Sequence, residues 1–426
     1  MITDEDSLEC AKRAYLYKSF LDMGNYPDAL NAWRWVYEEC PELYLSVYQD
    51  GARIFKHLIT GEKDENVKDR LVDTLIMIYD KRIEYFGDHE KYPECYILGI
   101  KGKDLLLYKD DPESIRQAYE CLKKSVDCRK DKTDVAILDP FVRAAIKMNE
   151  KGNISDEELL IDYFLAIEIL DNKQSKPGVK EKELSRIRMS REIIERSLKN
   201  SSLVKNKKLL PALELLISRS AGNIILLNNI VILLNKLEET DNNTYFKALE
   251  IIQKEKPSAI SAHSLAVMSI KKGDHKKAVK YYKQAIDFQK DNNEKAKYYL
   301  EMASIYFQYY KNYSKAREYA LKAAAIRTNW GDPYIFIGRI YAASSQECGK
   351  EVFEQQAVYW VAVDKFEKAK TIDPSVAGKA DELINSHVKH FPLKQDIFFN
   401  PEVEEGDPYT VGCWINEKTT ARGRPE

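Results

Sequence analysis

The stretch from residue 258 to residue 374 decides the fold, because it holds three similar segments in succession. The first reads Ala266-Val267-Met268 … Gly273-Asp274 … Ala278 … Tyr282 … Ala285, the second Ala303-Ser304-Ile305 … Lys311-Asn312-Tyr313 … Ala316 … Ala320 … Ala323, and the third Gly338-Arg339-Ile340-Tyr341 … Ala362 … Phe366 … Ala369 … Asp373-Pro374. Small residues recur where two helices must touch. Larger apolar or aromatic residues recur where a side chain must fill the groove of a neighbouring helix. The pattern predicts three consecutive helical hairpins.

This pattern resembles the tetratricopeptide repeat (TPR), whose period of about 34 residues is close to the spacing of the first two segments. Residues 8–41 contain a complete copy with the turn Gly24-Asn25-Tyr26-Pro27, and further pairs of helices are expected at 43–86, 96–128, 134–170, 182–218 and 224–254. In the fourth of these six regions, Ser155 followed by Glu158 predicts a capping box. We therefore predict an all-α fold, a TPR-like α-solenoid of about nine helical hairpins with a cap helix and a short C-terminal β-hairpin.

Composition agrees with a long helical protein. The chain has 426 residues, of which 17 are glycine and 14 are proline, and such scarcity favours helices over loop-rich β structure. Its net charge of −2 offers no bulk field to attract nucleic acid. It contains no apolar run long enough for a transmembrane helix. The first six residues, Met1 to Asp6, are acidic and have no apolar core, so they predict no signal peptide.

We expect five segments along the chain. They are N-terminal TPR-like repeats (1–171), divergent helical repeats (172–257), C-terminal TPR repeats (258–374), a cap helix (375–391) and a β-prone tail (392–426). Residues 172–179 are either a loop or a hinge between two half-solenoids, and the immediate return of helical pattern favours the loop. In the tail, Asp396-Ile397-Phe398-Phe399 and residues 409–415 are β-prone, and a hairpin between them should dock on the last repeats because an isolated hairpin is marginal in water. Residues 420–426 are expected to be disordered.

The whole chain resembles a family of TPR proteins found in Bacteroidetes. The residues that carry the resemblance are Asn25-Tyr26-Pro27-Asp28-Ala29, Trp33, Cys40-Pro41, Asp50-Gly51-Ala52-Arg53-Ile54, Ala357-Val358-Tyr359-Trp360-Val361-Ala362-Val363-Asp364-Lys365-Phe366, Asp373-Pro374-Ser375, Phe391-Pro392, Asp396-Ile397-Phe398-Phe399, Glu405-Gly406-Asp407 and Tyr409-Thr410-Val411-Gly412-Cys413-Trp414-Ile415. The resemblance implies an exported protein of the periplasm or cell envelope, and supplies no biochemical role. This sequence departs from the family in lacking the export signal, so a cytoplasmic location stays open.

The seven cysteines bear on the compartment. Cys10 and Cys40 lie at the adjacent ends of one expected antiparallel hairpin, within reach of a disulfide. A bond between Cys348 and Cys413 would attach the tail to the last repeat. The envelope resemblance favours both bonds. The alternative is that all seven are reduced core residues of a cytoplasmic protein. The pairing of Cys95, Cys121 and Cys128 stays open, except that Cys121 and Cys128 are too far apart on one helix to bridge.

The chain contains no catalytic or nucleotide-binding motif of the common kinds. His387 and His390 could share a metal ion, but a solvated helix face explains them better, so no metal and no cofactor are expected. The basic cluster Lys271-Lys272, Lys276-Lys277, Lys280 and Lys283 is likewise better explained as a solvated face than as a nucleic-acid site. Adjacent pairs such as Glu157-Glu158 point different ways on a helix and form no acid–base couple.

The function expected from this sequence is a non-enzymatic scaffold that binds a protein or peptide on the concave surface of its repeats. By repeat register, the inward-facing positions of the first helix in each hairpin are His263, Val267, Lys271, Glu301, Ile305, Gln308, Tyr309 and Arg339. An uncontacted solvent face is the alternative for these residues. Two other functions stay open: a structural spacer or assembly factor that engages partners through the tail, and an enzyme whose site is built from distant segments.

Overall fold

The computed structural model describes residues 4–220 and 222–425. The contacts group the chain into two compact units, residues 1–220 and 221–426. Residues 172–179 fall inside the first unit and not at its boundary; residues 172–174 complete a helix, and residues 175–179 form the turn that follows it. Residues 1–3, which belong to the stretch that predicts no signal peptide, lie outside the described residues, and so does residue 426 of the expected disordered end.

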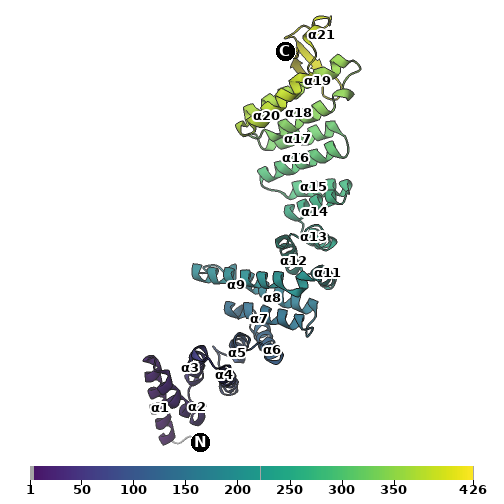
Figure 1. Ribbon diagram of the computed structural model, residues 1–426. Helices are drawn as coiled ribbons and strands as arrows, with labels where there is room; N and C mark the ends of the chain where they lie inside the picture. Colours follow the sequence, from purple (N-terminus) through teal and green to yellow (C-terminus); the bar gives the residue numbers. More distant parts are fainter. Residues whose placement is uncertain (1–3, 221, 426) are drawn as a thin grey trace. The chain divides into compact units, whose positions relative to one another are not determined.

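The first unit consists of helices joined by short turns (Figure 1). They are α1 (Asp4–Asp22), α2 (Tyr26–Glu39), α3 (Leu45–Gly61), α4 (Glu65–Phe86), α5 (Glu94–Tyr108), α6 (Pro112–Arg129), the 3₁₀ turn η1 (Lys130–Lys132), α7 (Val135–Glu150), α8 (Asp156–Gln174), α9 (Glu181–Asn200), α10 (Ser202–Lys205) and α11 (Leu209–Arg219). Helix α1 packs on α2, α3 on α4, α5 on α6 and α7 on α8. Each of these hairpins also contacts the next along the chain.

The second unit continues with hairpins and ends in a small β-structure. Its elements are α12 (Ile224–Lys236), α13 (Asn243–Glu255), α14 (Ala259–Lys271), α15 (His275–Phe288), α16 (Asn292–Gln308), α17 (Tyr313–Ile326), α18 (Asp332–Ala343), η2 (Ser345–Glu347), α19 (Val352–Ile372), η3 (Pro374–Val376), α20 (Ala377–His387), η4 (Val388–His390), α21 (Lys394–Phe398), β1 (Pro408–Val411) and β2 (Glu417–Thr420). Helix α20 packs on α19 in the place predicted for the cap helix. The fold is therefore all-α and TPR-like with a short C-terminal β-hairpin, as the sequence predicts.

Local sequence explains where the helices begin. The Asp64 and Asp111 side chains accept hydrogen bonds from the first free N–H groups of α4 and α6. Ser155 and Glu158 form the predicted capping box, with the Glu158 N–H donating to Ser155 Oγ at 3.1 Å and the Ser155 N–H donating to Glu158 Oε2 at 2.8 Å. The turn before α15 needs the left-handed conformation of Gly273, at φ +75°.

The small residues of the repeat pattern lie where helices make their closest contacts. Ala266, Ala278, Ala303 and Ala316 are completely or almost completely buried. At Gly338 a Cβ atom would lie 2.4 Å from the Phe366 ring, so only glycine permits this approach of α18 to α19. The aromatic residues of the pattern, Tyr282 and Phe366, are buried as predicted.

Two parts of the predicted arrangement are wrong. The fifth pair, expected at 182–218, is not a hairpin: α9 packs on α7 and α8, while α11 packs on α8. In the tail, residues 396–398 belong to helix α21, and the hairpin instead pairs Pro408 with Thr420 and Val411 with Glu417. A short amphipathic run such as 396–399 can form either helix or strand, and here Ile397 is buried by a helical turn.

Candidate functional site

The predicted partner-binding surface lies on α14, α16 and α18, and two of its residues touch. His263 Nε2 lies 2.7 Å from Glu301 Oε2, which joins α14 to α16. The His263 ring stacks on Tyr298 at a centroid distance of 4.4 Å and meets the ring of Tyr282 edge-on. Burial, followed by the negative charge of Glu301, raises the pKa of Tyr282. These contacts set the spacing of the two helices at their half-exposed face.

Four of the predicted residues are exposed, namely Lys271, Gln308, Tyr309 and Arg339. The Tyr309 ring stacks on His275 at 3.7 Å, which connects the end of α16 to the start of α15. Lys271 Nζ lies 3.8 Å from Asp241 Oδ2, a weak and exposed ion pair. The four side chains are therefore accessible from solvent along α14, α16 and α18.

The two apolar members of the predicted set lie differently. Val267 is half-buried, whereas Ile305 is 1% exposed and belongs to the core. Ile305 follows the buried Met302 by three residues, so both side chains lie on one face of α16. Ile305 therefore offers no surface to a partner, which corrects its place in the predicted set.

Two residues that contact the predicted set, Tyr298 and His275, are not members of it. Tyr298 precedes Glu301 by three residues, so helical periodicity places the two side chains on one face of α16. That spacing could have added Tyr298 to the set once Glu301 was named. His275 follows the N-cap Asp274 at the first position of α15, where no repeat position marks it.

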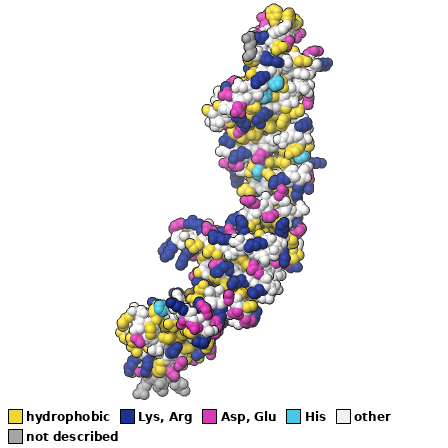
Figure 2. Space-filling model, viewed as in Figure 1, with side chains coloured by type: hydrophobic (Ala, Val, Ile, Leu, Met, Phe, Trp, Pro, Cys, Tyr) yellow, Lys and Arg dark blue, Asp and Glu magenta, His cyan; other side chains and the backbone are white. Residues whose placement is uncertain are grey.

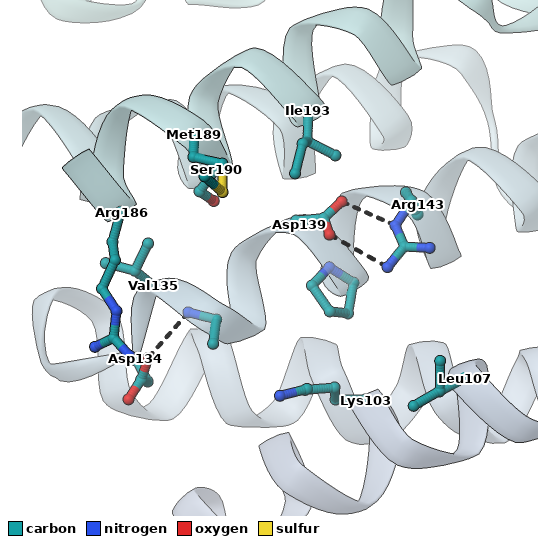
Figure 3. Close-up of a pocket in the computed structure, with 12 residues that line it drawn as sticks. Lys103, Leu107, Asp134, Val135, Asp139, Arg143, Arg186, Met189, Ser190 and Ile193 are labelled. Carbon is teal, nitrogen blue, oxygen red and sulfur yellow. Dashed lines mark hydrogen bonds and ion pairs between the residues drawn. The ribbon is translucent and has the colours of Figure 1, made fainter. Parts of the chain in front are cut away.

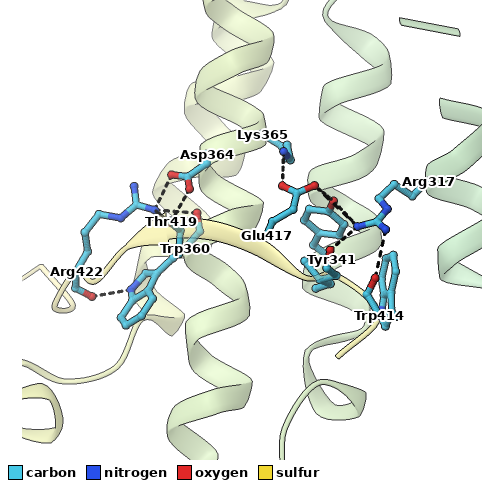
Figure 4. A network of polar contacts seen from close by, with 10 residues as sticks. Arg317, Tyr341, Trp360, Asp364, Lys365, Trp414, Glu417, Thr419 and Arg422 are labelled. Carbon is cyan, nitrogen blue, oxygen red and sulfur yellow. Dashed lines mark hydrogen bonds and ion pairs between the residues drawn. The ribbon is translucent and has the colours of Figure 1, made fainter. Parts of the chain in front are cut away.

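The C-terminal tail is held by polar contacts to the last hairpins (Figure 4). Arg317 of α17 donates from Nη1 to the carbonyl oxygen of Ile415 at 2.6 Å and from Nη2 to that of Trp414 at 3.2 Å. Its guanidinium lies over the Trp414 ring, 5.0 Å from the centroid. The Tyr341 hydroxyl of α18 donates to Glu417 Oε1. Together these contacts fix the loop between β1 and β2.

Helix α19 binds β2 and the residues after it. Trp360 Nε1 donates to the carbonyl oxygen of Arg422 at 2.7 Å, and Arg422 Nη2 donates to the carbonyl oxygen of Trp360 at 2.8 Å and to Asp364 Oδ1 at 2.7 Å. The Thr419 hydroxyl donates to Asp364 Oδ2 at 2.5 Å. The tail docks on the last repeats as predicted. The expected disorder of residues 420–426 is wrong for those described, because Arg422 supplies these bonds. We call the contacts of Arg317, Tyr341, Trp360 and Asp364 with residues 414–422 the tail clasp.

Six cysteines are paired. The disulfides are Cys10–Cys40, Cys95–Cys128 and Cys348–Cys413, with Cα–Cα distances of 6.2, 6.3 and 5.1 Å. The pair Cys95–Cys128 joins α5 to α6 and was left open by the sequence. Cys121 is free, and burial raises the pKa of its thiol. The first two bonds each lie within one hairpin, while the third attaches the tail to the segment between α18 and α19.

A pocket in the first unit was not predicted (Figure 3). It lies between α5, α7 and α9 and has a volume of about 300 Å³. Two carboxylates line it, but Asp134 accepts the Ala136 N–H as the cap of α7 at 2.9 Å, and Asp139 Oδ1 is bonded to Arg143 Nε at 2.8 Å. Since both are engaged in these bonds, they do not form an acid–base couple. The sequence missed this pocket because its third wall is α9, whose packing on α7 was not foreseen.

The structure also places the two histidines considered as metal ligands. His387 Nδ1 lies 2.7 Å from the Leu383 carbonyl oxygen, and the His390 ring stacks on Tyr359 at 4.8 Å. Among residues 4–220 and 222–425, no group of three or more His, Cys, Asp or Glu side chains is placed to hold a metal ion. Within the same ranges, no helix combines the length and apolar character needed to cross a membrane.

Comparison with known proteins gives no family. No family model matches the chain, and no curated protein matches it. Among solved structures, it is similar to the TPR2AB domain of yeast Sti1 in complex with pHSP90 (19% identity, covering 68% of this chain and 98% of that one, TM-score 0.25), to yeast Tom70 (13%, 92% and 90%, TM-score 0.28) and to a human IFIT1 dimer with PPP-AAAA (13%, 90% and 95%, TM-score 0.29). At these TM-scores the likenesses carry no information on ligand or function.

Proposed function

We propose that this protein is a non-enzymatic interaction scaffold that binds a protein or peptide partner across α14, α16 and α18. The observation that supports the proposal is the accessible row formed by Lys271, Gln308, Tyr309 and Arg339 beside the His263–Glu301 contact. It combines cationic, amide and aromatic side chains. Such a mixture is typical of recognition surfaces, where aromatic and arginine residues supply most of the binding energy.

The second unit gives this surface a rigid base. The row lies over helices whose contacts are made by fully buried alanines, and the tail clasp holds the last hairpin. A partner that binds a preformed surface loses little free energy to ordering the protein. The row therefore suits recognition by shape and polar contact.

The test is a triple variant, Lys271→Ala, Tyr309→Ala and Arg339→Ala, compared with a double variant, Lys280→Ala and Lys283→Ala, on α15. Cross-linking and mass spectrometry in the native host identify the partner, and its affinity for each purified variant is then measured. We expect the triple variant to bind about 100-fold more weakly, because truncating even one Tyr or Arg hot-spot residue costs about 2 kcal/mol or more. The α15 variant should bind as the unchanged protein does.

The melting temperature provides the control. Because the three side chains are largely exposed, the triple variant should lose only the stacking of Tyr309 on His275, and its melting temperature should fall by no more than a few degrees. Equal affinities of the triple variant and the unchanged protein, or a loss of folding that parallels the loss of binding, would remove this surface from the proposal.

The proposal includes an oxidising compartment, the periplasm or cell envelope, and kinship with the Bacteroidetes family. Three disulfides support it, because such bonds persist in oxidising compartments and are rare in the cytosol. Alkylation of intact cells before lysis tests the location. Only Cys121 should react if the protein resides outside the cytoplasm, whereas seven reactive thiols would place it in the cytoplasm.

A second candidate is a structural role in which partners bind the tail. It is favoured by Phe398 and Phe399 at the end of α21, which are 81% and 71% exposed. Adjacent exposed aromatic rings are costly in water and mark contact sites. The variant Phe398→Ser with Phe399→Ser tests this role without disturbing the tail clasp. Loss of a cross-linked partner in this variant, with binding kept in the triple variant, would favour the tail.

A further inference from the structure

We infer that the pocket between α5, α7 and α9 is a second binding site, which takes a bulky apolar side chain from an acidic peptide segment of a partner protein. The site lies wholly in the first unit. It is independent of the surface on α14, α16 and α18, so the failure of either proposal leaves the other standing.

The walls of the pocket are apolar and exposed. Leu107 of α5 and Met189 of α9 are 65% and 62% exposed. Figure 3 shows Met189 and Ile193 on α9 facing α7, with Leu107 on α5 across the pocket. Placing an apolar group between these side chains removes their surfaces from water and is favourable by roughly 25 cal/mol for each Å².

The charges that line the pocket are mostly positive. Lys103 forms no ion pair with any described residue, and Arg186 has only Glu183, at 3.8 Å on its exposed side. The lining carboxylates Asp134 and Asp139 are already bonded to the α7 backbone and to Arg143. The backbone bond leaves the Asp134 carboxylate charged, so one negative group faces the two cations Lys103 and Arg186, while Asp139 and Arg143 offset each other. The lining therefore has an excess of one positive charge, which an occupant with carboxylate groups would complement.

A buried hydroxyl also points to an occupant. Ser190 is 7% exposed and lines the pocket, and its Oγ has no hydrogen-bond partner within the described chain. Leaving a buried hydroxyl unbonded is unfavourable, and most such groups in native proteins have a partner. The Ala136 carbonyl oxygen is a second polar group on the pocket wall. Pro140 has no N–H, so it cannot donate the helix hydrogen bond that this oxygen would otherwise accept.

The volume selects the kind of occupant. About 300 Å³ lies at the lower end of the range for small-molecule pockets, and suits one large side chain. A neighbouring depression shares Lys103 and Asp134 and continues past Lys56 and Arg129. A peptide can place one anchor in the pocket and extend an acidic residue along this depression toward Arg129, which forms no ion pair with any described residue, whereas Lys56 is bonded to Asp104 at 2.6 Å. A compact ligand would leave that part empty.

Three fluorescein-labelled nine-residue peptide pools test the inference by fluorescence anisotropy with the full chain. The first has a central Trp, Phe or Leu flanked by Asp and Glu, the second has the same flanks with a central Ala, and the third has the same centre flanked by Lys. We expect the first pool to bind at least about tenfold more tightly than the others, and to weaken as salt is added because its charges are screened. Equal binding of the first and third pools, or of the first and second, would overturn the inference.

Matched variants assign binding to the pocket. Arg186→Glu should weaken the first pool about tenfold, while Arg196→Glu, an equal charge change on an exposed residue of α9 outside the pocket, should alter it less than about twofold. Ser190→Ala should weaken binding without lowering the melting temperature, because it removes a hydroxyl that has no partner in the free protein. Equal effects of Arg186→Glu and Arg196→Glu would contradict the assignment.

Indole-3-acetate separates a peptide from a small carboxylate ligand. It offers one aromatic group and one carboxylate, without the extended flanks. We expect it to displace the first pool only at concentrations about 100-fold higher than the unlabelled peptides need, since it lacks the added charges. Displacement at the same concentration would mean that the pocket serves a small carboxylate, and would overturn the peptide inference.

Discussion

The two units stabilise helical hairpins in different ways. In the first unit, buried carboxylates connect neighbouring helices. Asp162 of α8 is 1% exposed and accepts the Tyr119 hydroxyl at 2.6 Å and Lys123 Nζ at 2.6 Å. Asp104 of α5 is bound by a tyrosine and a lysine in the same way. Both disulfides of this unit close single hairpins.

In the second unit, neighbouring helices are instead held together by buried alanines at their contacts and by the tail clasp. The clasp uses polar groups that are closer to solvent, since the Glu417 side chain is 29% exposed. Both units have a surface of mixed charge, and Figure 2 shows this on the visible side. Alanine contacts require strict spacing and therefore leave a recognisable repeat in the sequence, whereas buried polar pairs hold together helices that follow the repeat less closely.

The largest effect should follow the loss of a buried tryptophan in each unit. Trp33 is 1% exposed and donates to the Val47 carbonyl oxygen, while Trp360 is 0% exposed and belongs to the tail clasp. We expect Trp33→Ala and Trp360→Ala each to lower the free energy of unfolding by about 3–5 kcal/mol. Hydrogen exchange should show that only Trp360→Ala exposes the amides of β1 and β2.

Loss of protection in the β-hairpin of Trp33→Ala would mean that the tail depends on the first unit. Protected β-strands in Trp360→Ala would mean that the clasp does not need α19.

Removing disulfides should have the next largest effect. The bond Cys348–Cys413 spans 65 residues, against 30 for Cys10–Cys40 and 33 for Cys95–Cys128. Each paired Cys→Ser change should lower the free energy of unfolding by about 2–4 kcal/mol, and most for the longest loop, because a longer loop gains more entropy when released. Urea unfolding of the three double variants measures the order, and a tail bond that costs the least would contradict it.

A smaller effect separates the two kinds of polar contact. Tyr119→Phe leaves the buried Asp162 without one donor, so we expect a loss of about 1.5–3 kcal/mol. Tyr341→Phe should lose less than about 1 kcal/mol, because Glu417 keeps Lys365 and is open to water. Equal losses in urea unfolding would show that burial does not distinguish the two contacts.

The smallest effect is a pH dependence confined to the second unit. Burial, followed by the charge of the nearby His390 and Arg339, lowers the pKa of His387, although the hydrogen bond to the Leu383 carbonyl oxygen opposes this. The unfolded chain then binds a proton more readily than the folded one, so stability is present above pH 6.5 and falls as pH drops through the lowered pKa. Melting curves between pH 7.5 and about 5 should show this fall, and His387→Gln should reduce it. An unchanged slope in His387→Gln would assign the fall to other groups.

Much of the fold could be predicted because it depends on local spacing. Ala266, Ala303, Gly338 and Phe366 mark helix contacts directly, and these contacts fix most hairpins of the second unit. Strand β1 overlaps the β-prone stretch expected at 409–415, but the position of β2 and its pairing with β1 could not be predicted. Their pairing depends on side chains of α17, α18 and α19, which are distant in sequence.

The candidate sites could be predicted only in part. Repeat register brought His263 and Glu301 together, but the same register selected Ile305, since a rotation of one helical position moves a residue from surface to core. The pocket of the first unit could not be predicted from the sequence, because Ser190 and Met189 line it only if α9 packs on α7. That choice depends on shape complementarity between three helices rather than on spacing along one of them.

The tail clasp has a consequence for synthesis of the protein. Arg317 and the carbonyl oxygen of Ile415 that it binds are 98 residues apart. While the ribosome is still translating that interval, α17 and α18 have emerged without the backbone groups that their polar side chains later bind. Helices α1 to α15 can pack as they are made, but the last hairpins complete their contacts only when residue 422 has left the exit tunnel. A chaperone or translocation factor that acts on the nascent chain would therefore find its longest-lived target at α17 and α18.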